Sequence, residues 1–378
     1  MTTKLRAASF QDNAVTTAKI AADAITTDKL YTPNLGRRNL IINGAMQVFQ
    51  RGTSFTSVSN TAYHADRFEL YMQNEASVYT VTQDSDAPNG FANSLKLDVT
   101  TADTSTASNE EVKLFHKLEG QDLQQFKKGT SDAEQMTLSF YVKTNKTGVY
   151  CVELYDRDNN RDVSASYTVS DTGWNRYVIT FPADTTGAFD DDNASSLEIT
   201  FWLIAGSAVQ GGTLNTSWRS VADSSSATGQ VNFADSTDNN WAITGVQLEV
   251  GEQATPFEHR SFGEELALCQ RYYQIIPKYT FFTGAVEVGT ASLRAGVPLA
   301  RTLRASPTIG NITLVIYDDD DTSFSNAAHA IFANSGSPEV DGTTGYLSVI
   351  FSGNLSGRTD NHNVTALYGT NGTLDSEL

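Results

Sequence analysis

The settings of four tryptophans decide which of them could bind a sugar. The apolar face of a pyranose ring stacks on an indole, while neighbouring amides and acids bind its hydroxyls. Trp174 follows the turn sequence DTG, and Trp218 lies in a polar stretch from residue 211 to 232. Both are candidate ligand contacts, and packing within the fold or between subunits is the competing explanation. Trp202 lies in an apolar run, so we expect it to be buried, and Trp241 is the fourth candidate.

Two runs of aspartates could bind a cation. Like charges repel one another unless a positive charge joins them, and carboxylate oxygens are the ligands that calcium prefers. Neither run has the glycine-centred spacing of an EF-hand, so a solvated acidic loop is the alternative interpretation. The candidate ligands for a structural calcium ion are Asp190, Asp191, Asp192, Asp318 and Asp320.

No catalytic motif is present in the sequence. It has no GxSxG, HExxH, P-loop or dinucleotide-binding fingerprint, and its five histidines lack ligand-like spacing. A glycosidase carboxylate pair has no sequence spacing of its own, so Glu153 with Asp156, or the acids of residues 190–192, could still form one. We predict a protein that is not an enzyme, with a glycan depolymerase as the less favoured alternative.

The charge balance excludes several classes of partner. The chain has 26 basic and 44 acidic residues, a net charge of -18. Such a surface repels phosphate backbones, so no nucleic-acid partner is expected.

No apolar stretch reaches the length of a membrane span, and the first residues lack the apolar segment of a signal peptide. Cys151 and Cys269 form no framework and are predicted to be free, buried thiols.

The composition predicts an all-β protein. Turn-forming residues are abundant, and 15 Tyr and 19 Phe favour pleated sheets. Apolar and polar residues alternate over residues 137–143, as in a strand with one solvated face. Similar runs at regular spacing predict one jelly-roll β-sandwich over residues 37–262. Its expected strands are residues 77–81, 94–99, 136–143, 148–155, 177–181, 197–205 and 241–250.

A short repeat precedes this domain. Residues 13–20 recur ten positions later as residues 23–30, which places Val15, Ile20, Ile25 and Leu30 five residues apart. So few apolar side chains cannot bury a core alone. We therefore predict that residues 1–36 form an attachment or shaft segment, stabilised by identical chains or by a larger structure. A disordered tail is the alternative.

The chain after the first domain changes character. Apolar residues recur at helical spacing over residues 263–276 behind Glu264 and Glu265, whose charges suit a helix N-terminus. This pattern predicts a linker helix that Pro277 ends. Strand signals then return, and residues 277–378 are predicted to form a second, smaller β-sandwich.

Two motifs resemble a known family. The first comprises residues 38–52 (RNLIINGAMQVFQRG) and 63–68 (YHADRF); the second comprises residues 243–251 (ITGVQLEVG), 254–258 (ATPFE) and 265–273 (ELALCQRYY). Together they resemble phage tail-fibre and tail-appendage proteins that carry a jelly-roll domain related to carbohydrate-binding modules. The resemblance covers about residues 10–310.

This resemblance implies a setting and a function. It implies a virion protein of the phage tail, made in the host cytoplasm, that forms a homotrimer and attaches to other tail proteins through its N-terminus. Its β-domains would bind host surface glycan, several weak sites acting together. The alternative is a structural adaptor or decoration protein without a receptor role. Read physically, the two motifs are expected to form the first and last strands of one sandwich, where Asp66 and Arg67 could form a buried ion pair with Glu249 or Glu258 or hold a cation between strands.

Overall fold

The structure, a computed structural model, describes residues 37–277, 284–287, 292–310, 313–315, 331–333, 336–340, 346–352, 363–364 and 372–378. Strands dominate these residues, which confirms the predicted all-β class. None of their helices is long and apolar enough to span a membrane. Val15, Ile20, Ile25 and Leu30 lie outside the described residues, so the shaft stays a prediction.

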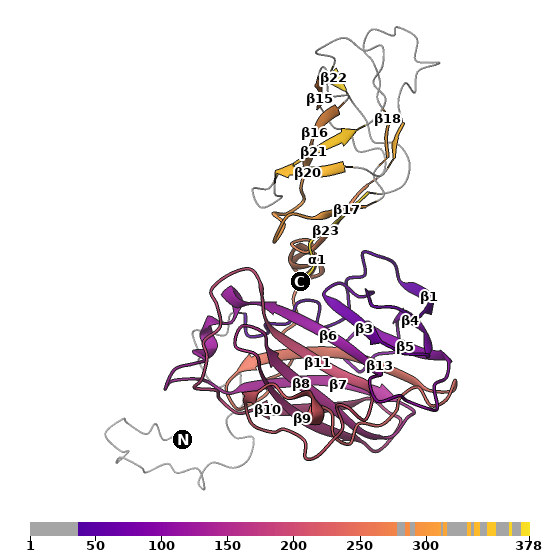
Figure 1. Ribbon diagram of the computed structural model, residues 1–378, viewed down its shortest axis with the longest axis vertical. Coiled ribbons are helices and arrows are strands. Elements are labelled where there is room, and N and C mark those ends of the chain that lie inside the picture. Colours follow the sequence, from indigo (N-terminus) through magenta and orange to yellow (C-terminus); the bar gives the residue numbers. More distant parts are fainter. Residues whose placement is uncertain are drawn as a thin grey trace, which may run out of the picture. The chain divides into compact units, whose positions relative to one another are not determined.

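Two antiparallel sheets form the main body (Figure 1). Sheet A contains, in spatial order, β1 (Ser54–Val58), β4 (Val78–Asp84), β5 (Ser94–Thr101), β13 (Asn240–Val250), β7 (Met136–Thr144) and β10 (Asn175–Phe181). Sheet B contains β12 (Arg219–Ser220), β9 (Arg161–Val169), β8 (Gly148–Asp156), β11 (Ser195–Ala205), β6 (Glu111–Glu119), β3 (Phe68–Gln73) and β2 (Ala62–Tyr63). Every strand that we expected before residue 262 is present.

The chain crosses repeatedly from one sheet to the other, as in a jelly roll. After β3 in sheet B it forms β4 and β5 in sheet A, and from β6 to β13 it changes sheet five more times. The inner faces meet in an aromatic core: Phe140 of sheet A contacts Phe201 and Tyr167 of sheet B edge to face, at centroid distances of 5.0 and 5.1 Å. The predicted jelly-roll sandwich is therefore confirmed.

The two motifs lie side by side, as expected, but the first is not a strand. The Leu40 amide donates to the Leu248 carbonyl over 3.1 Å, whereas residues 42–45 form turns. The Asn39 side chain accepts from the Ile41 amide, and Asn43 accepts from two amides that follow it. These side-chain bonds compete with strand pairing, which explains the turns.

The linker helix is shorter than predicted. Helix α1 (Phe262–Cys269) begins with a capping box between Ser261 and Glu264, and it ends seven residues before Ile276. Residues 273–276 instead form β14 (Tyr273–Ile276), which pairs with β23 (Gly372–Asp375). Pro277 therefore follows a strand. Short 3₁₀ turns η4 (Gly120–Asp122) and η5 (Gln124–Phe126) follow β6, and η6 (Asp223–Ser225) lies between β12 and β13.

Further antiparallel sheets follow α1. One has the order β14, β23 and β17 (Thr308–Gly310). Another contains β20 (Gly336–Val340), β21 (Tyr346–Ser352), β16 (Ser292–Pro298), β15 (Gly284–Glu287) and β22 (Asn363–Val364), and β18 (Thr313–Val315) pairs with β19 (Ile331–Ala333). These strands agree with the predicted β character of residues 277–378. The division into domains at residues 36, 262 and 276 stays a prediction.

The last residues of the chain return to the sandwich. Arg67, which is 1% exposed, pairs with Glu377, and its guanidinium stacks on the Tyr272 ring at 3.4 Å. Arg51 pairs with Asp375 at 3.0 Å and with Glu377 at 3.4 Å. We call this contact of residues 375–378 with the sandwich the C-terminal latch; the C-terminus lies beside α1 (Figure 1).

The latch corrects one expectation about ion pairs. Arg67 pairs with Glu377, and Asp66 lies 3.5 Å from Arg51, so neither uses the acids of the second motif. Glu258 accepts the Asn39 amide at 2.6 Å, and Glu249 accepts from Thr255. Glu377, which lies 310 positions further along the chain, therefore pairs with Arg67, and Arg51 pairs with Asp66, in place of the acids of the second motif.

Candidate functional site

Four aromatic rings gather on the outer side of sheet A. Tyr141 alternates on β7 with Phe140 and Val142, which are fully buried, so it points outward. Phe91, from the loop between β4 and β5, lies 5.4 Å from Tyr141 and 4.9 Å from Phe257 between ring centroids. His259 lies 4.9 Å from Phe257. We call Phe91, Tyr141, Phe257 and His259 the aromatic platform; it is partly exposed.

A glycine in β13 makes room for the platform. Gly245 has a φ of +63°, a conformation that other residues rarely adopt, and the β13–β7 pairing shifts register between Thr244 and Gln247. A Cβ atom at Gly245 would lie 2.7 Å from the Phe91 ring and 2.8 Å from the Tyr141 ring. The backbone thus approaches both rings as closely as glycine allows, which fixes their position over the sheet.

A polar cleft adjoins the platform on the same face. Its volume is about 420 Å³. Lys143 lines it two residues after Tyr141 on β7, and Asp86 lines it from the loop that carries Phe91. Strand alternation places Tyr141 and Lys143 on one face, so cleft and platform form a continuous surface. The lining residues are Asp84, Asp86, Ser94, Lys96, Lys143, Asn145, Thr172, Asn240 and Ala242.

Paired charges hold the cleft together. Lys143 Nζ lies 2.6 Å from Asp86 Oδ2, and Trp174 Nε1 donates to Asp86 Oδ1 over 3.1 Å. These two bonds, from Lys143 first and Trp174 second, hold the pKa of Asp86 below its ordinary value. Lys96 lies 3.0 Å from Asp98 and 3.7 Å from Asp84. The cleft therefore presents ammonium and carboxylate groups side by side.

The structure separates the two predicted tryptophans. Trp174 is partly buried and bonds a cleft residue, Asp86. Trp218 packs against the core, donates from Nε1 to the Pro182 carbonyl over 2.8 Å and has the Lys128 ammonium 5.1 Å from its ring centroid. Trp202 is 1% exposed beneath the loop after β11, as expected. A ligand role for Trp174 and Trp218 stays a prediction, and only Trp174 lies beside the cleft.

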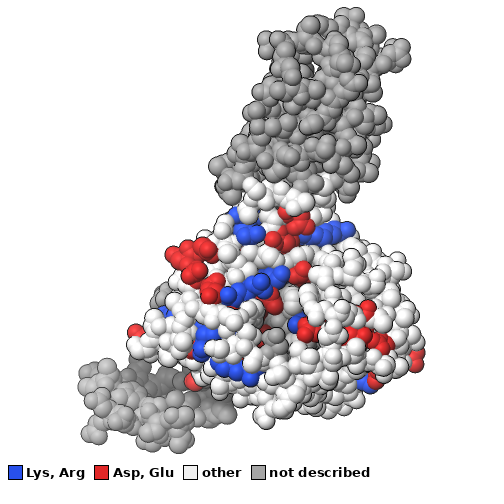
Figure 2. All heavy atoms as spheres, in the orientation of Figure 1, with Lys and Arg blue, Asp and Glu red and all other residues white. Residues whose placement is uncertain are grey.

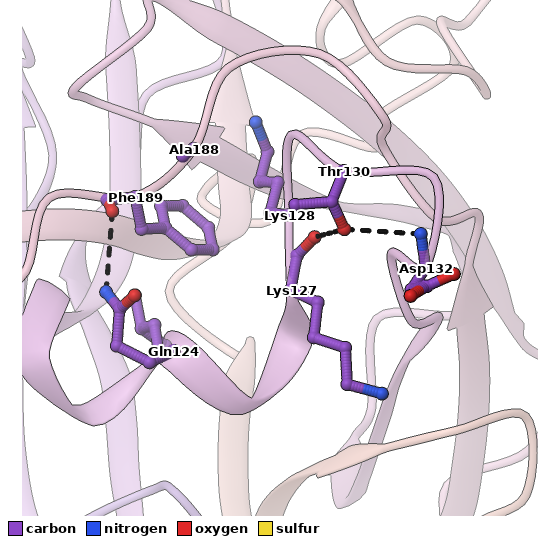
Figure 3. Close-up of a pocket in the computed structure, with 8 residues that line it drawn as sticks. Gln124, Lys127, Lys128, Thr130, Asp132, Ala188 and Phe189 are labelled. Carbon is purple, nitrogen blue, oxygen red and sulfur yellow. Dashed lines mark hydrogen bonds between the residues drawn. The ribbon is translucent and has the colours of Figure 1, made fainter.

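A second hollow of about 420 Å³ lies beside η5 (Figure 3). Lys127, Thr130 and Phe189 line it. Its polar groups already bond the surrounding loops: the Lys128 ammonium lies 2.5 Å from Asp156 and 3.0 Å from Asp184, and Gln124 donates to the Phe189 carbonyl over 3.4 Å. This hollow therefore serves the packing of loops.

Of the two aspartate runs, residues 190–192 lie in the part of the chain that the structure describes, and they form a turn. Asp190, Asp191 and Asp192 are exposed. The Asp190 amide donates to Asp158, and Asp192 Oδ1 accepts the Ala194 amide over 2.8 Å, the pattern of an Asx turn. Asp318 and Asp320 lie outside the described residues. Calcium binding by these aspartates stays a prediction.

Another group of acids could hold a cation. Glu75, Asp103 and Glu110 each bring a carboxylate oxygen to within 4.8 Å of the others. Burial, together with the neighbouring charges of Asp103 and Glu75, raises the pKa of Glu110. Glu75 comes from the loop between β3 and β4, and Asp103 and Glu110 come from the loop between β5 and β6.

The carboxylates proposed as a glycosidase pair do not line the cleft. Glu153 is 7% exposed and accepts from Trp202 Nε1 over 3.2 Å on the outer side of sheet B. Asp156 is fully buried and pairs with Lys128. Both acids therefore bond buried neighbours, and neither has an open cleft in front of it among the hollows described above.

Sequence reasoning missed the aromatic platform. Tyr141 carried one usable signal, because it is an aromatic residue at a solvated position of an alternating strand. Phe91 and Phe257 lie in loops more than 160 residues apart, and only the closure of the jelly roll brings them together.

No family model and no curated protein matches this chain. Among solved structures, it is similar to the enzymatically active domain of tailspike protein 4 of bacteriophage CBA120, with 14% identity and a TM-score of 0.29 over 56% of this chain and 21% of that one. A putative sugar-binding protein from Bacteroides thetaiotaomicron has 16% identity and a TM-score of 0.30 over 56% and 100% of the chains.

A family 11 carbohydrate-binding module of the cellulase Lic26A-Cel5E from Clostridium thermocellum has 12% identity and a TM-score of 0.28 over 53% of this chain and 100% of that chain. At these identities and scores, the three likenesses carry no argument about function. The proposal below therefore depends on the residues of the cleft and the platform.

Proposed function

We propose that this chain binds glycans on the outer face of sheet A. The observation that carries the proposal is the continuity of the aromatic platform with the polar cleft. Sugars present apolar ring faces and hydroxyl edges together, so a site that binds them needs stacking rings next to donors and acceptors. Tyr141 and Phe91 supply the rings, and Asp86, Lys143 and Lys96 supply the polar groups.

The setting in a phage virion follows from the sequence resemblance. Under this proposal the chain is a tail-fibre subunit and a receptor-binding protein, not an enzyme, which attaches to other tail proteins by residues 1–36 and forms trimers. Charges of both signs lie interspersed on the face drawn in Figure 2, a pattern that supports contact with sugars better than with nucleic acid.

The test is binding to an array of bacterial surface polysaccharides. We expect Tyr141→Ala and Phe91→Ala each to weaken binding roughly tenfold, since a stacked ring contributes about 1 kcal/mol beyond its buried area. Tyr71→Ala is the matched control, because Tyr71 is a partly exposed ring that stacks on Phe115 on sheet B. Equal binding by all three variants would remove the platform from the site.

Two alternatives give different results. A structural adaptor would bind no polysaccharide and would lose assembly with virion parts when the platform is changed. A depolymerase would release reducing sugar from host capsule or lipopolysaccharide, and Glu153→Gln would stop that release. The aromatic platform is partly exposed in the single chain, which favours glycan binding over the role of a structural adaptor.

A further inference from the structure

We infer that the cleft on sheet A selects uncharged sugar chains over acidic ones and that Asp86 is the residue that determines this specificity. This inference rests on the proposed glycan-binding function and adds the class of ligand.

The charges of the cleft balance. Two lysines and two aspartates line it, Lys96, Lys143, Asp84 and Asp86. Lys143 already has Asp86 at 2.6 Å, and Lys96 has Asp98 at 3.0 Å. Although partial burial lowers the pKa of Lys96, its bonds to Asp98 and Asp84 raise it above the ordinary value. Each ammonium group in the cleft therefore has a carboxylate partner from the protein.

Both lysines of the cleft are already paired with carboxylates of the protein, so neither is free to neutralise an acidic sugar. A uronate, sulfate or phosphate group would have to separate a lysine from its aspartate or lie beside the carboxylates of Asp84 and Asp86. Either arrangement places like charges close together, and the net charge of -18 adds repulsion at longer range. Specificity here comes from unfavourable contacts with the wrong ligand as much as from favourable ones with the right ligand.

A neutral sugar can use the ion pairs as they stand. The Lys143 and Asp86 side chains are 35% and 54% exposed, so solvent and ligand hydroxyls reach them. One hydroxyl of a sugar can donate to Asp86 while its neighbour accepts from Lys143, and neither bond requires the pair to separate. Charge-assisted hydrogen bonds of this kind are stronger than neutral ones.

Asp86 is held in place for this role. Trp174 Nε1, from the loop before β10, donates to one oxygen of Asp86, and Lys143 Nζ, from β7, donates to the other. These two bonds fix the plane of the carboxylate. Each oxygen accepts more than one hydrogen bond, which leaves both able to receive hydroxyls. Trp174 thereby acts as a positioning residue, without itself being required to stack on the sugar.

The experiment compares each acidic polysaccharide of the array with its own carboxyl-reduced form. The two polymers share a backbone and differ in charge, so calorimetry measures the effect of charge alone. We expect the carboxyl-reduced form to bind at least tenfold more tightly than the acidic form. Raising the salt concentration should narrow the difference, because salt screens the repulsion between exposed charges.

Two variants test the role of Asp86. Asp86→Asn should weaken binding of the neutral polymers about tenfold. It should also reduce the difference in affinity between the neutral and the acidic polymers. Asp132→Asn is the matched control: it removes the same charge from an exposed loop residue that does not line the cleft, so it should change neither the affinity nor the preference. Thermal melting of both variants confirms that they are folded.

The outcomes separate the two proposals. Acidic polymers that bind as tightly as their reduced forms overturn the inference and leave glycan binding intact. A folded Asp86→Asn variant with unchanged binding and preference overturns the role of Asp86. A native protein that binds neither form of any polymer overturns the proposed function itself.

Discussion

Glu153 connects the stability of the sandwich to pH through a single carboxyl group. It lies beneath Trp202, opposite Ser164 in the β8–β9 ladder, and is 7% exposed. Burial raises its pKa to about 7; Lys113 opposes this, and Asp162 and Glu198 add to it. The folded protein therefore prefers the protonated form of this acid.

The sign of the pH effect follows from the raised pKa. The stabilisation is fully present below the ordinary pKa of 4.5 and is lost as pH rises through about 7. Glu153→Gln keeps an oxygen that accepts from Trp202 and cannot ionise. We expect the variant to match the native protein at pH 5 and to exceed its free energy of unfolding at pH 8 by on the order of 3 kcal/mol.

Urea unfolding at several pH values measures this difference. Glu252→Gln, a change in an exposed loop residue, is the control and should track the native protein at every pH. If the curves of the native protein and Glu153→Gln stay parallel from pH 5 to pH 8, Glu153 does not bind a proton in this range.

At the scale of elements, the C-terminal latch couples the end of the chain to the start of the sandwich. Arg67 lies directly before β3 with a φ of +69°, and its side chain points to Glu377, which is 4% exposed. A buried guanidinium without its carboxylate partner costs several kcal/mol. β23 and the residues after it therefore contribute to the stability of strands that precede them by about 300 residues in the sequence.

We expect Glu377→Gln to lower the free energy of unfolding by about 3 kcal/mol, because it removes one partner of a buried ion pair. The double variant Arg67→Met/Glu377→Gln should recover part of this loss, since it removes both charges. Lys127→Gln breaks an exposed pair with Glu134 and should change the free energy of unfolding far less, because solvent screens that pair. Chemical denaturation of the four proteins measures the coupling; a Glu377→Gln variant no weaker than Lys127→Gln would contradict the latch.

The elements also show where prediction from sequence succeeds. The capping box of Ser261 and Glu264 is a local signal, and α1 begins where that signal places it. The predicted end of this helix was wrong, because the Tyr272 and Tyr273 rings stack on Arg67 and Arg51, which are distant in the sequence. A helical pattern continued over these residues, and tertiary contacts replaced it with β14.

At the scale of the whole molecule, the predicted trimer depends on residues 1–36. Val15, Ile20, Ile25 and Leu30 recur too sparsely to form a core within one chain. We expect light scattering to give three times the chain mass for the full protein and the mass of one chain after removal of residues 1–36. One chain mass for both proteins would show that the repeat docks on another virion protein, which favours the adaptor.

The sequence by itself determined the β class, the seven expected strands of the first domain and the position of the helix start, because each depends on neighbours within a few residues. It also identified Trp202 as buried from its apolar run. These features follow from local periodicity and turn chemistry.

Only the tertiary structure decided what lies on the face of sheet A. Phe91, Tyr141 and Phe257 meet there because the jelly roll brings two loops and a strand together, and Gly245 leaves them space. The same closure pairs Asp86 with Lys143 and Trp174, which belong to three separate segments. Contacts between distant segments leave no periodicity in the sequence, so the candidate site could be located only after the chain had folded.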